Sequence, residues 1–184
     1  MQHGIRTRSV FIAFAILGLA IVALSQSSGT AQWQIAGHDL SNSRSQPDEH
    51  VIGTANVAQL AVKWTFTTGG DVSATPIVAG ANVYFPDWAG NLFAVSAKDG
   101  KQLWSHKISD YDNVPGAISR VSPAMHGSNL ILGDIQNSQQ AHNGASIMSV
   151  DRNTGALSWI TKVDSHPAAV ITGSPVVAGD VVYG

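Results

Sequence analysis

The sequence predicts an all-β fold, a partial β-propeller of about two and a half four-stranded blades. One pattern occurs twice in full and begins a third time near the C-terminus: a Ser-Pro or Thr-Pro step, two apolar runs and a Gly-x-x-x-Trp turn. Its prolines, Pro76, Pro123 and Pro175, are 47 and 52 residues apart. This period is typical of one propeller blade per repeat, and no sustained helical period occurs beyond the N-terminus.

The first 31 residues are predicted to be a secretory signal peptide. Arg6 and Arg8 precede the apolar run 10–24, and small polar residues follow up to Ala31, after which we expect cleavage. A run of 15 apolar residues is short for a membrane span, so cleavage is favoured over an uncleaved anchor. We therefore expect a periplasmic or secreted protein with no stable membrane span. The absence of cysteine excludes a disulfide framework and a lipid-modified N-terminal cysteine.

The charge pattern argues against nucleic acid as a partner. Without residues 1–31 the chain has 8 basic and 12 acidic residues, a net charge of −4. No cluster of lysine or arginine is present that could bind a run of phosphates.

Residues 32–61 have no counterpart in the repeats and are predicted to form an irregular lead-in with a short helical turn at 56–60. Residues 62–67, VKWTFT, favour a strand, with Trp64 in the position that Trp104 and Trp159 take in the later copies. A lone strand before the first blade would close the last blade and remove its free edge. We expect 62–67 to pair with residues outside this chain.

Residues 73–108 form the first predicted blade, 120–163 the second and 172–184 the start of a third. The first blade has four short β-rich segments separated by Ala-Gly or Asp-Gly, at 76–78, 82–86, 91–97 and 101–108. Propellers close with roughly four to eight blades. A stack that ended after two and a half would expose an unpaired edge, so we expect these residues to be the N-terminal fragment of a longer protein.

The turns at the end of the repeats carry the first family resemblance. Residues 149–159, SVDRNTGALSW, are similar to the tryptophan-docking motif of quinoprotein dehydrogenase propellers, Ala-x-Asp-x-x-Thr-Gly-x-x-x-Trp, with Ser149 in place of Ala. Residues 94–104, AVSAKDGKQLW, form a looser copy. In that family the motif joins neighbouring blades, so it implies an architecture and not a reaction.

The lead-in resembles the polyvinyl-alcohol-dehydrogenase-like branch of the enzymes that depend on pyrroloquinoline quinone (PQQ). The resemblance starts at Trp33 with AGHDLSNSRS and continues through NVAQLAVKWTFTTGGDVSATP. It implies an eight-bladed propeller with PQQ near its axis and Ca²⁺ beside the quinone. The implied reaction is the oxidation of a small or polymeric alcohol, such as polyvinyl alcohol, with electron transfer to a cytochrome c or similar acceptor.

Arg120 and Thr172 are the predicted cofactor-binding residues. Related dehydrogenases have an arginine at the position of Arg120 that pairs with a PQQ carboxylate, and a guanidinium can hold a carboxylate through two parallel hydrogen bonds. Thr172 is at the matching place of the third repeat, where the family uses a hydroxyl. The alternatives are a surface or inter-blade arginine and a hydroxyl that closes a strand end. At Ser73, the matching place of the first repeat, several relatives carry an acidic contact that this chain lacks.

Other family features are absent or expected elsewhere. Residues 112–116, DNVPG, stand where alcohol dehydrogenases of this kind have adjacent cysteines. The resemblance places the calcium-binding glutamate and the general-base aspartate beyond Gly184, so we expect no catalytic or metal-binding residue here and no activity from this piece alone. Trp88 follows a strand and could face the axis, although core packing is the commoner role of a propeller tryptophan.

A non-enzymatic propeller is the alternative. The same repeats occur in scaffolds of the outer-membrane assembly type, which bind proteins through loops or edges. Arg120 and the dehydrogenase-like lead-in favour the enzyme, and a lipoprotein cysteine that would favour the scaffold is missing.

Overall fold

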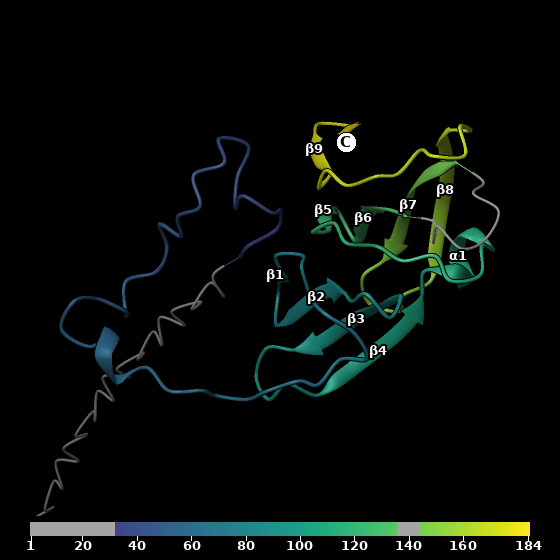
Figure 1. Cartoon of the computed structure of the whole chain (residues 1–184). Coiled ribbons are helices and arrows are strands. Elements are labelled where there is room, and N and C mark those ends of the chain that lie inside the picture. Colours follow the sequence, from purple (N-terminus) through teal and green to yellow (C-terminus); the bar gives the residue numbers. More distant parts are fainter. Residues whose placement is uncertain (1–31, 136–143) are drawn as a thin grey trace, which may run out of the picture.

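The computed structural model describes residues 32–135 and 144–184, so the predicted signal peptide lies outside the described residues. Two four-stranded antiparallel sheets lie next to each other, and a two-stranded sheet follows the second (Figure 1). Across residues 32–135 and 144–184, helix is limited to two short turns. Within the described ranges, no helix is long and apolar enough to cross a membrane. The predicted all-β, propeller-type fold is confirmed.

Each four-stranded sheet is a simple meander in which consecutive strands pair. The first has the order β1-β2-β3-β4 and the second β5-β6-β7-β8. In both sheets the third strand is buried along most of its length, while the fourth is largely exposed. The strands are β1 (Ile77–Ala79), β2 (Asn82–Pro86), β3 (Asn91–Ser96), β4 (Gln102–Lys107), β5 (Ala124–His126), β6 (Asn129–Gly133), β7 (Ala145–Asp151), β8 (Leu157–Asp164), β9 (Val176–Ala178) and β10 (Val181–Tyr183).

The two sheets share one hydrophobic core. Tyr84 and Leu92 of the first sheet belong to the same buried cluster as Leu130 and Met148 of the second. All four side chains are fully buried. Such apolar burial is worth roughly 1.5–3 kcal/mol for each large side chain, so the sheets stabilise each other as stacked blades do.

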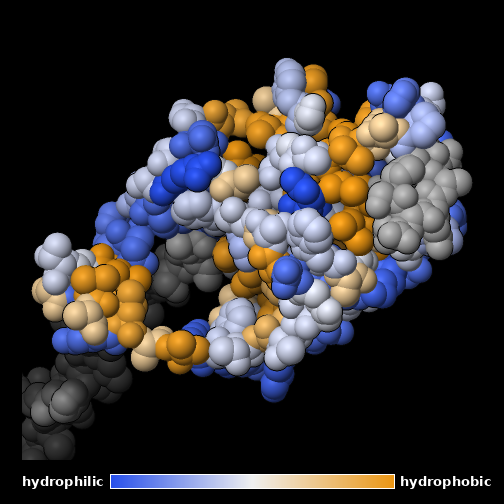
Figure 2. Space-filling model, viewed as in Figure 1, coloured by the Kyte–Doolittle hydropathy of each residue, from blue (hydrophilic) through white to orange (hydrophobic). Residues whose placement is uncertain are grey.

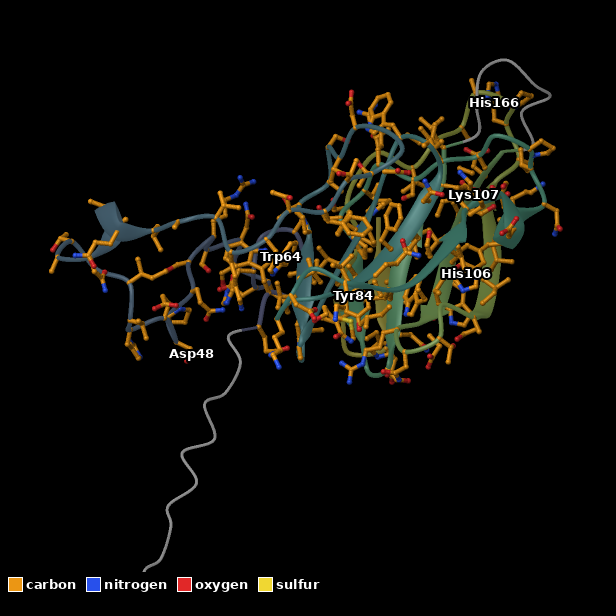
Figure 3. All side chains as sticks on the ribbon, turned by 90° about the horizontal axis from the view of Figure 1, so that it is seen from below. Asp48, Trp64, Tyr84, His106, Lys107 and His166 are labelled. Atoms are coloured by element: carbon orange, nitrogen blue, oxygen red, sulfur yellow. The ribbon has the colours of Figure 1, made fainter. Side chains whose placement is uncertain are left out.

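The repeated tryptophans connect successive repeats by the same contact. Trp64 donates its indole N–H to the carbonyl of Ala97 at 3.0 Å, and Trp104 donates to the carbonyl of Arg152 at 2.9 Å. Each acceptor lies three residues before a glycine on which the tryptophan ring rests: Gly100 for Trp64 (labelled in Figure 3) and Gly155 for Trp104. The Gly-x-x-x-Trp repeat is thus an inter-blade contact.

Gly100 and Gly155 are required at these turns for two reasons. Their φ angles are +72° and +75°, a conformation that disfavours side chains. A Cβ would also lie within 2.8 Å of the Trp64 ring at the first turn and within 2.9 Å of the Trp104 ring at the second. Asp151 fixes the second turn by accepting hydrogen bonds from the Thr154 N–H and hydroxyl, both at 2.9 Å. These bonds lower the pKa of Asp151.

The start of the lead-in pairs with β1, the edge strand of the first sheet. Trp33 pairs with Val78 of β1 through two backbone hydrogen bonds of 2.8 and 2.7 Å. The short helical turn η1 (Val57–Gln59) lies within the predicted stretch 56–60. Around η1 the lead-in exposes apolar residues, visible as the orange group at the left of Figure 2: Val51, Ile52, Val57, Leu60 and Val62.

Residues 62–67 lie extended but have no strand partner within the described part of the chain. Their pairing with residues outside this chain stays a prediction. The helical turn α1 (Ser109–Asp112) was not predicted, because four residues show no helical period. It joins the first sheet to the second and ends at Asn113, whose φ of +59° closes the turn.

Candidate functional site

The Ser-Pro and Thr-Pro steps of the three repeats lie side by side. The N–H of Thr75 donates to the hydroxyl of Ser122 at 2.8 Å, and the N–H of Ser122 donates to the hydroxyl of Ser174 at 3.0 Å. These partners are 47 and 52 residues apart, the spacing of the repeats. Consecutive blades therefore present equivalent positions to one another.

These steps form the wall of a pocket of about 430 Å³. The structure brings Arg120, Thr172 and Ser73 into this pocket, each two residues before a step hydroxyl or its threonine equivalent. The lining combines hydroxyl groups with two arginines and includes no acidic residue: Ala36, Arg44, Ser73, Ala74, Thr75, Trp88, Arg120, Ser122, Thr172 and Ser174. A site with this lining suits an anionic ligand with several hydrogen-bond acceptors.

Arg120 is exposed at the pocket and contacts an aromatic ring. Its guanidinium carbon lies 5.8 Å from the centre of the Trp88 ring, within the range of a cation–π interaction. Among the described residues, neither Arg120 nor Arg44 forms an ion pair with a carboxylate. The Arg44 Nε–H donates to the Asn42 Oδ1 at 3.4 Å, so neither guanidinium is committed to a carboxylate and both can pair with an acidic ligand.

Ser73 holds Trp88 in place. The indole N–H of Trp88 donates to the Ser73 hydroxyl at 2.8 Å. Trp88 is 45% exposed and lines the pocket, so of the two roles considered for this tryptophan the structure does not show core packing. The reason is that Trp88 lies in the tight turn after β2, where its backbone is held at the edge of the sheet.

Asp87 makes that turn rigid. Its fully buried carboxylate accepts hydrogen bonds from the N–H groups of Gly69 and Gly70, at 3.0 and 3.2 Å, and from the N–H of Asn91 at 2.8 Å. The N–H of Trp88 donates to the carbonyl of Asp71 at 2.9 Å. A buried carboxylate with this many donors has its hydrogen-bonding capacity satisfied, so the turn that carries Trp88 is held in one position.

Arg44 is the pocket residue that the sequence did not reveal. It ends a compact loop of the lead-in in which the Asp39 carboxylate accepts the N–H groups of Ser41 and Ser43, at 2.9 and 3.0 Å. Hydrogen bonds from the Ser43 hydroxyl and N–H are the main reason that the pKa of Asp39 is lowered to about 2. The N–H of Arg44 donates to the carbonyl of Gly37 at 3.1 Å and closes the loop. Because the lead-in has no counterpart in the repeats, spacing could not point to Arg44.

The half-buried Asp112 and the fully buried Asp134 lie near the end of α1. Asp112 accepts the N–H of Val114 at 2.8 Å, and the fully buried Asp134 accepts the N–H of Ser146 at 2.7 Å. Their second oxygens are buried without a hydrogen-bond partner within the described ranges. Burial, aided by the neighbouring Asp134, raises the pKa of Asp112 to about 7, and burial also raises the pKa of Asp134. Both carboxyl groups are therefore protonated more readily than an exposed aspartate.

The described ranges contain no group of three or more side chains that could hold a metal ion. A calcium site formed by residues after Gly184 therefore stays a prediction. The cofactor roles of Arg120 and Thr172 also stay predictions, although the structure places both at the same pocket.

Comparison with known proteins gives relatives among quinoprotein alcohol dehydrogenases. A polyvinylalcohol dehydrogenase of Pseudomonas sp. is 27% identical over 147 residues, which cover 78% of this chain and 21% of the relative. A 1-butanol dehydrogenase (cytochrome c) of Thauera butanivorans is 28% identical over 181 residues, 92% of this chain and 25% of the relative. The chain thus spans about a fifth to a quarter of the length of these curated relatives.

Among solved structures, BamB from Moraxella catarrhalis is similar with a TM-score of 0.51 and 21% identity, over 67% of this chain and 37% of that chain. This similarity concerns the fold alone. The family model PQQ_2, described as outer membrane protein assembly factor BamB, matches residues 18–184. With its repeated Gly-x-x-x-Trp turns and stacked four-stranded sheets, the chain belongs to this PQQ_2 repeat family and is related to the quinoprotein alcohol dehydrogenases.

Proposed function

We propose that this chain is the N-terminal part of a PQQ-dependent dehydrogenase that oxidises alcohols and passes the electrons to a cytochrome c or a similar acceptor. The relatives named for the oxidation of butanol and polyvinyl alcohol support a small or polymeric alcohol as substrate. The sequence pattern of residues 1–31 supports export to the periplasm or beyond.

The observation that carries the proposal is the pocket of Arg120, Thr172 and Ser73. PQQ is a planar polycarboxylate, and the lining offers unpaired guanidiniums and hydroxyls without a competing acid. Arg120 would hold one carboxylate through two parallel hydrogen bonds, and Thr172 would donate its hydroxyl to a neighbouring oxygen. When bound, PQQ supplies a quinone that accepts a hydride from the alcohol.

The remaining chemistry belongs to residues outside this chain. A carboxylate that takes the hydroxyl proton and the ligands of Ca²⁺, which would polarise the quinone, are expected beyond Gly184. The described residues would therefore bind and orient the cofactor, while the reaction itself needs the whole protein.

A protein-binding scaffold is the second candidate. The description of the matching family and the BamB-like fold favour it. A scaffold that binds through loops or edges has no need of an acid-free pocket with two unpaired arginines, which is why we place it second.

The test uses the whole protein expressed from its complete reading frame. The purified protein is incubated with PQQ and Ca²⁺, and the reduction of an artificial electron acceptor is followed with butanol and with polyvinyl alcohol. The dehydrogenase proposal predicts stoichiometric PQQ binding and alcohol-dependent dye reduction. A folded protein that does not bind PQQ would contradict the proposal and favour the scaffold.

A further inference from the structure

We infer that Trp88 is a positioning residue for Arg120: its indole face holds the guanidinium at the pocket so that all of the guanidinium N–H groups stay free for a ligand carboxylate. This inference rests on the proposed function, because it assigns a role in PQQ binding. It is carried by a continuous series of contacts from a buried turn to the pocket.

The series begins at the turn after β2. The Asp87 carboxylate holds this turn through Gly69, Gly70 and Asn91, and the backbone of Trp88 is tied to Asp71. Both ends of the tryptophan are therefore fixed, the backbone by Asp71 and the indole N–H by the Ser73 hydroxyl at 2.8 Å. A ring held at two points offers a defined face and loses little further entropy when it contacts a cation.

The guanidinium of Arg120 lies against that face, at 5.8 Å from the ring centre. Arg120 is exposed, so without this contact its long side chain would sample several rotamers over the pocket. The cation–π interaction limits this freedom. It thereby lowers the entropic cost of forming two parallel bonds to a carboxylate.

The chemistry of the partner explains why an aromatic ring suits this task. A carboxylate that positioned Arg120 would occupy the same N–H donors that the ligand needs. An indole face attracts the cation through its π electrons and uses none of the five N–H groups.

Ser73 takes part in the same arrangement. Its neutral hydroxyl accepts the indole N–H and stabilises the ring without placing a carboxylate beside Arg120. Ser73 and Trp88 together form a neutral support for the arginine.

The test is a double-mutant cycle on PQQ affinity in the whole protein. Dissociation constants for PQQ in the presence of Ca²⁺ are measured by calorimetry for the wild type, Trp88→Leu, Trp88→Phe, Ser73→Ala, Arg120→Gln and the double variant Trp88→Leu/Arg120→Gln. The thermal unfolding midpoint of each variant is measured in parallel, so that a loss of folding is separated from a loss of positioning.

We expect Trp88→Leu to weaken PQQ binding about threefold to tenfold, the range of a cation–π contact at a partly exposed site. Trp88→Phe keeps a ring face and should stay within about twofold of the wild type, and Ser73→Ala should fall between the two. In the Arg120→Gln background, Trp88→Leu should have no further effect, because there is no guanidinium left to position.

Two results would overturn the inference while leaving the proposed function intact. An equal loss from Trp88→Leu in both backgrounds would mean that Trp88 contacts the ligand or only supports the fold. Unchanged affinity of Trp88→Leu in the wild-type background would mean that the ring does not position Arg120. If the folded wild type does not bind PQQ, the proposed function fails and this inference fails with it.

Discussion

Gly155→Ala tests how much the close packing of the inter-repeat turn contributes to the free energy of unfolding. Gly155 has a φ of +75°, and an added Cβ would clash first with the His106 ring, whose Nε2 lies 2.7 Å away, and then with the Trp104 ring at 2.9 Å. The positive φ costs about 1–2 kcal/mol for a residue with a side chain. Forcing the side chain against packed rings adds about 1–3 kcal/mol. The expected loss in the free energy of unfolding is therefore about 2–5 kcal/mol.

Gly127→Ala is the matched control. Gly127 has a φ of +59°, but nothing lies within 4 Å of its Cβ position, so alanine there incurs the backbone cost of about 1–2 kcal/mol alone. The assay is urea unfolding of the whole protein, followed by tryptophan fluorescence, with the free energy extrapolated for each variant. Equal losses for Gly155→Ala and Gly127→Ala would refute the idea that the Trp104 and His106 rings pack tightly on the second turn.

Two further predictions concern charged residues. Arg44→Gln should weaken PQQ binding severalfold in a calorimetric titration, since it removes the second guanidinium of the pocket. Arg152→Gln, in the turn between β7 and β8 and outside the pocket lining, should leave the affinity unchanged. Equal behaviour of the two variants would remove Arg44 from the site. The raised pKa of Asp112, about 7, means that the folded state binds more protons than the unfolded state between about pH 4 and 7, so stability should fall as pH rises through this window. In Asp112→Asn the urea midpoint should fall less between pH 5 and pH 8 than it does in the wild type. An unchanged dependence of the midpoint on pH would contradict the raised pKa of Asp112.

The fold could be predicted because its signals recur. The Ser-Pro or Thr-Pro step precedes the first strand of each sheet, and the Gly-x-x-x-Trp step covers the turn between the third and fourth strands. In the structure both steps make contacts between successive repeats. The same periodicity indicated that residues 73, 120 and 172 are equivalent, and they meet at one pocket. When every repeat makes the same contact, the residues that make it recur at a regular spacing and can be recognised in the sequence.

The features that could not be predicted do not recur with the repeat. Arg44 reaches the pocket from a lead-in that occurs once. The sequence leaves open whether Trp88 packs in the core or faces the axis, because it does not show which face of the turn the indole occupies. That face depends on the buried Asp87 and the Ser73 hydroxyl. Asp112 and Asp134 come close only through the packing of α1 and the end of β6, which no local pattern specifies.

The role of Arg120 in cofactor binding is measured by the PQQ dissociation constant of the whole protein with and without this guanidinium. We expect saturable binding by the wild type, a loss of about tenfold or more in Arg120→Gln, as for a charge-assisted pair of hydrogen bonds, and unchanged binding in Arg152→Gln. Binding of equal strength in all three proteins would place the cofactor elsewhere, and no binding by the folded wild type would contradict the dehydrogenase proposal.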